Sequence, residues 1–266
     1  MSSGDYVLGN DNVELKRLKL QHDLWKDQLV RLWSRAGFCS PGEFLELGCG
    51  PGFTTLDLDH FLQKQSRITA VDLSKDFLSN LNQIKNDNIK TVQSSLEKLN
   101  LSKKDFDFAF CRWLMIFVPN IHEAILKVHE HLKTGAIFAM QEYISYDSFS
   151  VSPESHIMKK VVDAIFQSWI DTGGYPNQGK RLPIVLENNG FEVLEIEPIA
   201  RVCRPNEPLW QWPESFWHSF LPRLVRSKHI TEEDRLEFLQ MWEDLKKTKG
   251  AFCIAPTVVN IIAKKR

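Results

Sequence analysis

The chain has no long apolar run and no paired cysteines. None of its 266 residues lies in a stretch near the roughly 18 apolar residues of a membrane span, and the N-terminus lacks the apolar core of a secretory signal. Its five cysteines are odd in number, and none forms a C-x-x-C pair. This usage argues against a disulfide framework and a structural zinc site. We therefore expect a reduced, cytoplasmic protein with no metal site and no membrane contact.

An excess of charge of one sign is also absent. Lys and Arg total 33 and Asp and Glu total 34, which gives a net charge of −1. Such a balance supplies no general field that would draw the protein to nucleic acid or anionic lipid. The one obvious basic cluster, "AKKR" at 263–266, is typical of a solvated tail. We expect no nucleic-acid partner, and the composition leaves a monomer and a homodimer both open.

Internal repeats and low-complexity linkers are missing as well, so the sequence predicts one domain spanning 1–266. What is present is an alternation of short apolar runs with helical periods. Because parallel strands need right-handed crossovers, this alternation predicts a doubly wound α/β fold. The expected strands of this first half are 43–47, 67–74, 89–95, 106–113 and 135–143.

Two segments lie outside the alternation. An amphipathic helical period ends at Gly37, so 1–37 forms an N-terminal helical element. After Tyr143 the sequence indicates a polar loop, two helices and an alternating strand, and a last strand follows at 257–265. Between them, about 203–250 carries two helical periods and reads as a cap inserted over the sheet edge. Its tryptophans are Trp210, Trp212, Trp217 and Trp242.

The glycine-rich stretch "ELGCGPG" (46–52) joins an expected strand to an expected helix. Glycines at such a turn allow a ligand to approach the backbone, and the helix amides then face that ligand. The spacing of Gly48, Gly50 and Gly52 differs from the G-x-G-x-x-G of dinucleotide sites, and no Gly-Lys-Ser/Thr follows as in a P-loop. An NAD-linked oxidoreductase is therefore disfavoured.

"LELGCGPG" followed by "AVDLS" (70–74) resembles motif I and the next acidic motif of class I S-adenosylmethionine-dependent methyltransferases of the small-molecule type. The resemblance is closest over 40–143. It implies a Rossmann-like seven-stranded sheet, S-adenosylmethionine as cofactor, and transfer of a methyl group. It also implies that the N-terminal element, with Tyr6, Arg17 and Gln21, folds over the cofactor as a lid. Amphipathic packing of this element on the sheet is the alternative, and the two can coexist.

The same resemblance implies a set of cofactor contacts. Asp72 would accept hydrogen bonds from the ribose hydroxyls, which suits a carboxylate with two acceptor oxygens. Ser95 stands where relatives commonly have an aspartate that receives the adenine amino group. The full set is Glu46 near the methionine amino group, the backbone of Gly48, Cys49, Gly50 and Gly52, then Asp72, Leu73 on the adenine, Ser95, Leu96, and Cys111, Arg112 and Trp113 on the methionine side.

Three of these residues have simpler interpretations. Asp72 could cap the following helix. Cys49 is more typical of a small packing residue than of a nucleophile. Arg112 could only pair with a surface acid.

The acceptor is narrowed by motifs that the chain lacks. The expected fourth strand is not followed by the Asn/Asp-Pro-Pro-aromatic loop of enzymes that methylate adenine or glutamine, and no Pro-Cys nucleophile of the cytosine C5 type occurs. A small molecule acceptor is therefore favoured. The tryptophans of 203–250 suggest an apolar or aromatic acceptor, although the core of the cap is the more typical place for such residues. We assign no catalytic base, because the candidates Glu142, Tyr143, His122, His156 and His218 are individually more typical of structural residues.

Phe117 occupies a position where many similar chains have a histidine, so a mechanism that relies on that histidine does not transfer. Together with Ser95, this departure keeps a second hypothesis open. It is a non-catalytic binding or regulatory protein that retains the methyltransferase fold.

Overall fold

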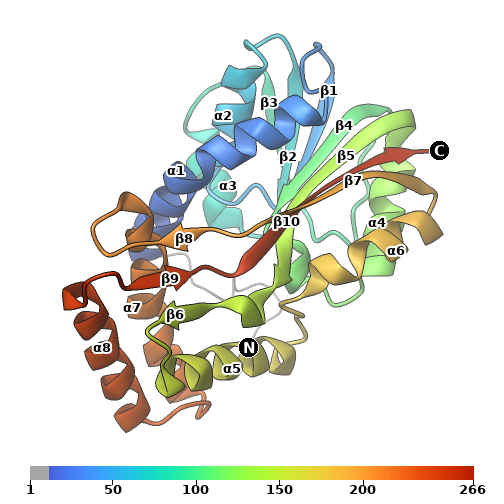
Figure 1. Ribbon diagram of the computed structural model, residues 1–266. Coiled ribbons are helices and arrows are strands. Elements are labelled where there is room, and N and C mark those ends of the chain that lie inside the picture. Colours follow the sequence, from blue (N-terminus) through green and yellow to red (C-terminus); the bar gives the residue numbers. More distant parts are fainter. Residues whose placement is uncertain (1–11) are drawn as a thin grey trace.

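A seven-stranded sheet forms the centre of the protein, whose computed structural model describes residues 12–266 (Figure 1). The strand order is β3-β2-β1-β4-β5-β10-β7. Strand β10 runs antiparallel to both of its neighbours, β5 and β7, and the other neighbouring pairs of this sheet are parallel. The predicted doubly wound, seven-stranded α/β sheet is confirmed. Its strands are β1 (Glu43–Leu47), β2 (Arg67–Asp72), β3 (Ile89–Gln93), β4 (Phe106–Arg112), β5 (Leu132–Ser145), β7 (Phe191–Ile199) and β10 (Thr257–Lys265).

Helices cover both faces of this sheet because its central strands are apolar on both sides. One face packs against α1 (Asn12–Arg35) and α2 (Phe53–Phe61), and the other against α4 (Ile121–His131) and α6 (Leu182–Asn188). The alternation is visible in β1, where Phe44 packs with α1 and α2 while Leu45 and Leu47 pack on the opposite face. A further helix, α3 (Lys75–Asn82), packs against β2 and β3.

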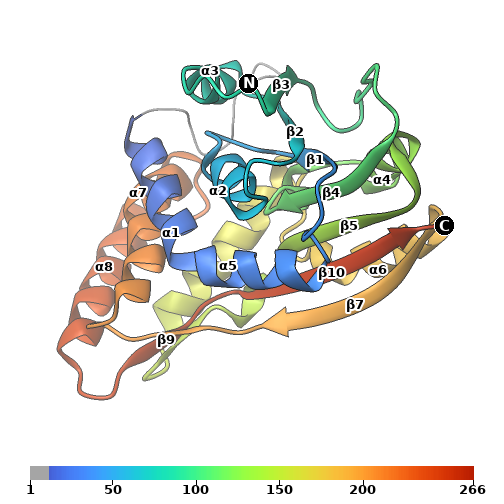
Figure 2. The same cartoon turned by 90° about the horizontal axis from the view of Figure 1, so that it is seen from above.

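Three more helices gather at the end of the molecule away from α4 and α6, as the two views show (Figures 1 and 2). They are α5 (His156–Asp171), α7 (Gln211–Arg226) and α8 (Glu232–Lys247). The last two occupy the segment 203–250, where the sequence indicates two helices. Trp210, Trp217 and Trp242 are all buried among them.

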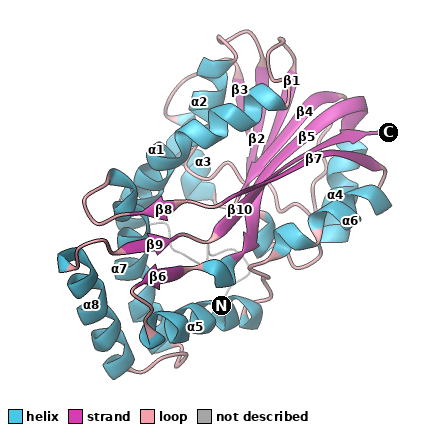
Figure 3. Ribbon diagram, viewed as in Figure 1, coloured by secondary structure: helices cyan, strands magenta, loops and turns pink. Residues whose placement is uncertain are grey.

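A small three-stranded sheet lies beside these helices (Figure 3). The sequence did not predict it. It pairs β6 (Ser150–Ser152), β9 (Phe252–Ile254) and β8 (Val202–Cys203), in that order. The predicted polar loop after Tyr143 is wrong at this point, since it contains β6. Strands this short show no reliable alternation, and their partners lie far away in sequence.

In the described part of the chain, none of the helices combines the length and the apolar character needed to span a bilayer. The N-terminal element corresponds to α1 from Asn12 onward. Tyr6, which the sequence places in the same element, lies outside the described residues.

Gly52 offers a test of the packing between α2 and α3. It precedes α2 with φ of +88°, and an added Cβ would lie 2.5 Å from Leu81 Cδ1. Gly173 has nearly the same φ, +87°, with no atom within 4 Å of an added Cβ. Both alanine variants pay the left-handed backbone cost of roughly 1–2 kcal/mol, but only Gly52→Ala also overpacks the core. Urea unfolding should show Gly52→Ala to be the less stable variant by about 1 kcal/mol or more; equal losses would contradict this packing role.

Candidate active site

The glycine turn after β1 brings the backbone close to the end of β2. At Gly48, where φ is +65°, an added Cβ would lie 2.8 Å from Leu114 Cδ1, so a side chain there would collide with the turn after β4. The Gly50 amide donates a hydrogen bond to Asp72 Oδ2 at 2.8 Å. This contact fixes the glycine turn against the neighbouring strand.

The Asp72 carboxylate holds two backbone amides at once. Besides the Gly50 amide, Oδ1 accepts the Ser74 amide at 2.8 Å. The cap of α3 is Ser74, whose hydroxyl accepts the Phe77 amide at 3.3 Å. Helix capping therefore does not account for Asp72. Burial raises its pKa, and the hydrogen bonds from backbone amides oppose that rise.

A cavity of about 610 Å³ opens along the ends of β1, β2 and β4. Its size lies within the usual range for small-ligand sites, and the carboxyl ends of strands are where such folds bind ligands. All of the predicted cofactor residues line it except Gly52 and Cys111. Gly52 faces Leu81, and Cys111 is fully buried with its thiol 3.7 Å from Glu142 Oε1. The residues from the predicted set are Glu46, Gly48, Cys49, Gly50, Asp72, Leu73, Ser95, Leu96, Arg112 and Trp113.

Cys49 is 4% exposed, and burial, helped by the charge of Glu46, raises its pKa well above the usual value. A thiol in this state is a poor nucleophile. The packing interpretation of Cys49 is therefore favoured.

Helix α1 contributes residues to the cavity that sequence reasoning missed, including Leu18 and His22. His22 Nε2 lies 2.8 Å from Asp57 Oδ2, and His22 Nδ1 lies 3.2 Å from Arg112 Nη2. An arginine can only donate, so Nδ1 accepts and Nε2 carries the proton that is donated to Asp57. Burial and the charge of Arg112 lower the pKa of His22, which keeps it neutral. Its only signal in the sequence was its position beside Gln21 in the expected lid.

Arg112 has no ion pair with a carboxylate within residues 12–266, so the surface-acid interpretation is wrong. Its guanidinium lies over the Trp113 ring, 4.7 Å from the centroid, and donates to His22. Burial lowers its pKa to about 10, so it stays charged at neutral pH. The Nη1 atom is shielded from solvent and has no hydrogen-bond partner among the described residues.

Glu46 on β1 is the acidic counterpart in the same cavity. It is 2% exposed, and its Oε2 atom lacks a hydrogen-bond partner in the described chain. Burial raises its pKa to about 7, although the Thr55 hydroxyl and the charge of Arg112 oppose the rise. One cavity therefore holds a carboxyl and a guanidinium group, each with an unsatisfied polar atom.

Residues of β5 fix the turn that follows β4. Trp113 has a φ of +50°, which is rare for a bulky side chain, and its amide donates to the Gln141 carbonyl at 2.8 Å. Glu142 Oε1 accepts the amides of Leu114 and Met115 at 2.9 and 3.0 Å. Glu142, a candidate base from sequence, is therefore turned toward backbone amides. Burial raises its pKa to about 7.

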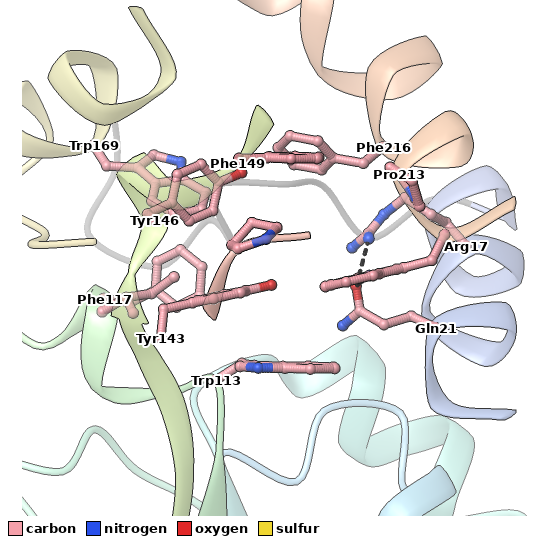
Figure 4. Close-up of a pocket in the computed structure, with 13 residues that line it drawn as sticks. Arg17, Gln21, Trp113, Phe117, Tyr143, Tyr146, Phe149, Trp169, Pro213 and Phe216 are labelled. Atoms are coloured by element: carbon pink, nitrogen blue, oxygen red, sulfur yellow. Dashed lines mark hydrogen bonds between the residues drawn. The ribbon is translucent and has the colours of Figure 1, made fainter. Parts of the chain in front are cut away.

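A second, aromatic pocket of about 50 Å³ adjoins the first (Figure 4). The two share Gln21, Trp113 and Phe117. Gln21 Oε1 accepts hydrogen bonds from Arg17 and from the Trp212 indole, both at 3.0 Å. The lining of this aromatic pocket consists of Arg17, Gln21, Trp113, Ile116, Phe117, Tyr143, Tyr146, Phe149, Trp169, Trp212, Pro213, Phe216 and Pro256.

Of the four tryptophans in 203–250, Trp212 alone lines the aromatic pocket. Trp242 stacks on Trp210 at 4.2 Å between ring centroids and meets Trp217 edge-on at 5.7 Å. The core-packing interpretation therefore holds for these three. No group of three or more His, Cys, Asp or Glu suited to a metal ion occurs in the described residues.

The glycine turn, the acidic end of β2 and the cavity between them define a Rossmann-like protein that binds a nucleoside-containing ligand. Comparison with known proteins agrees. Residues 45–140 match the family model described as "Methyltransferase domain".

Curated relatives are distant but carry methyltransferase names. The chain is 23% identical over 194 residues to a ubiquinone biosynthesis O-methyltransferase of Rickettsia canadensis, which covers 70% of this chain and 77% of that protein. It is 26% identical over 137 residues to a demethylmenaquinone methyltransferase of Lactococcus lactis, covering 50% of this chain and 52% of that one.

Solved structures share the fold. The geranyl diphosphate C-methyltransferase of Streptomyces coelicolor, in complex with S-adenosylhomocysteine, superposes with a TM-score of 0.57 at 15% identity, covering 97% of this chain and 84% of that chain. A Haemonchus contortus phosphoethanolamine N-methyltransferase superposes with the same score at 14% identity, covering 90% and 52%. The chain is a class I S-adenosylmethionine-dependent methyltransferase, and S-adenosylmethionine is its cofactor.

The raised pKa of Glu142 predicts a pH-dependent stability. Between pH 4.5 and 7 the folded protein holds a proton on Glu142 that the unfolded chain has lost, so the free energy of unfolding falls as pH rises through this window. Glu142→Gln removes the titrating group. Urea unfolding at pH 5 and pH 8 should show that wild type loses on the order of 2 kcal/mol more than Glu142→Gln between these pH values.

The exposed Glu233→Gln serves as the control variant for this measurement. It should show the pH dependence of the wild type. If Glu142→Gln shows that same dependence, Glu142 does not titrate as described.

Proposed function

We propose that the larger cavity binds S-adenosylmethionine with the ribose at Asp72 and the methionine part between Glu46 and Arg112. The observation that carries this placement is the pair of unsatisfied atoms, Glu46 Oε2 and Arg112 Nη1, in one cavity. An amino acid end group has an ammonium and a carboxylate, which would satisfy both atoms. Burial without such partners is costly for each.

The nucleoside end follows from the position of Asp72. Each of its oxygens accepts one backbone amide, and a carboxylate oxygen has capacity for a second hydrogen bond, here from a ribose hydroxyl. Leu73 is 45% exposed at the cavity and offers an apolar surface to the adenine. Ser95 and Leu96 lie on the same wall, where Ser95 would accept from the adenine amino group.

The methyl group then passes to a small molecule in the aromatic pocket. The sulfonium is already a good leaving group, so the main task of the protein is to hold the acceptor atom in line with the methyl carbon. The shared wall of Gln21, Trp113 and Phe117 supports this arrangement. The names of relatives and structural neighbours include O-, N- and C-methyltransferases, so they leave the acceptor atom open.

The chain acts in this proposal as one methyltransferase domain, 1–266. The N-terminal element 1–37 serves as a lid. This role is supported by the location of Leu18, Gln21 and His22 on the cavity wall. The segment 203–250 serves as a cap, supported by the hydrogen bond from Trp212 to Gln21.

Calorimetric titration tests the cofactor placement. Wild type should bind S-adenosylmethionine and S-adenosylhomocysteine, and NAD should give no heat. Asp72→Ala should weaken both by at least about tenfold, or roughly 1.4 kcal/mol. Asp72 also holds the glycine turn, so a milder variant is needed. Asp72→Asn keeps one acceptor oxygen, and its affinity for both compounds should lie between those of wild type and Asp72→Ala. Wild type that is folded yet binds neither compound would contradict the placement.

Binding should also release a proton from Glu46. With a pKa of about 7, this carboxyl is mostly protonated at pH 6.5, and an ammonium group placed against it would ionise it. Calorimetry with S-adenosylhomocysteine in buffers of different ionisation enthalpy should therefore show release of about half a proton or more at pH 6.5. Glu46→Gln should release none. Proton release unchanged in the variant would place the amino group elsewhere.

A further inference from the structure

The lining of the aromatic pocket contains neither a carboxylate nor an imidazole among the described residues. Its ionisable lining groups are Arg17, Tyr143 and Tyr146. Arg17 is held by both oxygens of Glu14, at 2.7 and 2.8 Å, and burial raises the pKa of Tyr146 well above its usual value. Methylation of an alcohol or an un-ionised phenol requires removal of a proton, and no carboxylate or imidazole is positioned here to take it.

The pocket is also small. Its volume is about 50 Å³. One water molecule needs roughly 10–15 Å³ of cavity volume in this measure, so the pocket has room for about three to five waters. A group of four or five heavy atoms fits this space.

Aromatic rings surround this space from several elements. In Figure 4, Trp113 and Tyr143 lie on one side, and Phe149 and Phe216 lie on the other. Trp169 meets Tyr146 edge-on, with 4.9 Å between centroids. Ring faces at close range attract a cation, most strongly where water is excluded, and this is how proteins recognise alkylated ammonium groups. The charge of Arg17 is balanced by Glu14 and so does not dominate the pocket.

We propose that the aromatic pocket takes the nitrogen of a small alkylated amine and that this nitrogen is the methyl acceptor. The inference rests on the function proposed above and names its substrate class. The nitrogen lone pair forms a bond to the methyl carbon while the carbon–sulfur bond breaks, and that electron pair stays on sulfur. S-adenosylhomocysteine leaves neutral, and the positive charge passes from sulfur to nitrogen.

This chemistry matches the pocket at each point. The neutral form of a tertiary amine has no proton to lose in the transfer itself. Its ammonium form gives up its proton to water before the lone pair meets the methyl carbon, so no base within the pocket is needed. The charge that develops on nitrogen is stabilised by the surrounding ring faces. The product head, a nitrogen with three or four small substituents, has the size of the free space.

A matched pair of probes tests the proposal. Choline and 3,3-dimethylbutan-1-ol have the same shape, but only choline carries a positive nitrogen. Calorimetry on the protein saturated with S-adenosylhomocysteine should show choline binding at least tenfold more tightly. Equal affinities, or a preference for the neutral alcohol, would overturn the proposal.

Two variants locate the binding. Trp169→Leu should reduce the preference for choline at least fivefold, whereas Trp242→Leu, which removes an equally buried indole outside the pocket, should keep it. Phe216→Leu removes a half-buried ring of the pocket and should also reduce the preference, which covers the case in which Trp169→Leu fails to fold. A preference unchanged in Phe216→Leu would place choline elsewhere.

Turnover gives the final comparison. With S-adenosylmethionine, N,N-dimethylaminoethanol should be converted to choline with release of S-adenosylhomocysteine, and 4-hydroxybenzoate should not be methylated. Methylation of the phenol alone would overturn the proposal. If the protein does not bind S-adenosylhomocysteine at all, the proposed function is wrong. Choline binding is therefore also measured without the cofactor, so that the substrate class is tested separately from cofactor binding.

Discussion

The hydrogen bond from the Gly50 amide to Asp72 joins the two strands on which the active site depends. It ties the glycine turn after β1 to the end of β2, and the second oxygen of the same carboxylate holds the start of α3. The cavity is lined by this turn and by the turn after β4. Asp72 is therefore a structural residue of the site as well as a candidate ligand for the ribose. The two roles are compatible because each carboxylate oxygen can accept a second hydrogen bond besides the one from a backbone amide.

The wall between the two pockets depends on β5 in a similar way. Gln141 and Glu142 bind the backbone on either side of Trp113, whose left-handed conformation would otherwise be disfavoured. The Trp113 ring then contacts Arg112 on the cofactor side and stacks with Tyr143 on the other. In the function proposed above, a rigid wall of this kind would align an acceptor with the methyl group, which is the main contribution that the chemistry requires from the protein.

The sequence predicts the sheet and most of the cofactor cavity because both come from local patterns. The glycine turn and Asp72 each follow an apolar strand, and parallel strands bring their carboxyl ends together. His22 and the three-stranded sheet could not be predicted, because the contacts that define them join residues far apart in the chain, such as Asp57 with His22 or Cys203 with Cys253. The only sign of the aromatic pocket in the sequence is the group of tryptophans in 203–250. Of these, Trp212 lines the pocket, and the other three are buried in the core.

A crystal structure with S-adenosylhomocysteine would test the central claim most directly. The account predicts that the ribose hydroxyls lie within hydrogen-bonding distance of Asp72, that the amino group faces Glu46, and that Arg112 Nη1 donates to the carboxylate. A ligand bound in the reverse direction, or one whose amino acid end avoids both Glu46 and Arg112, would contradict it.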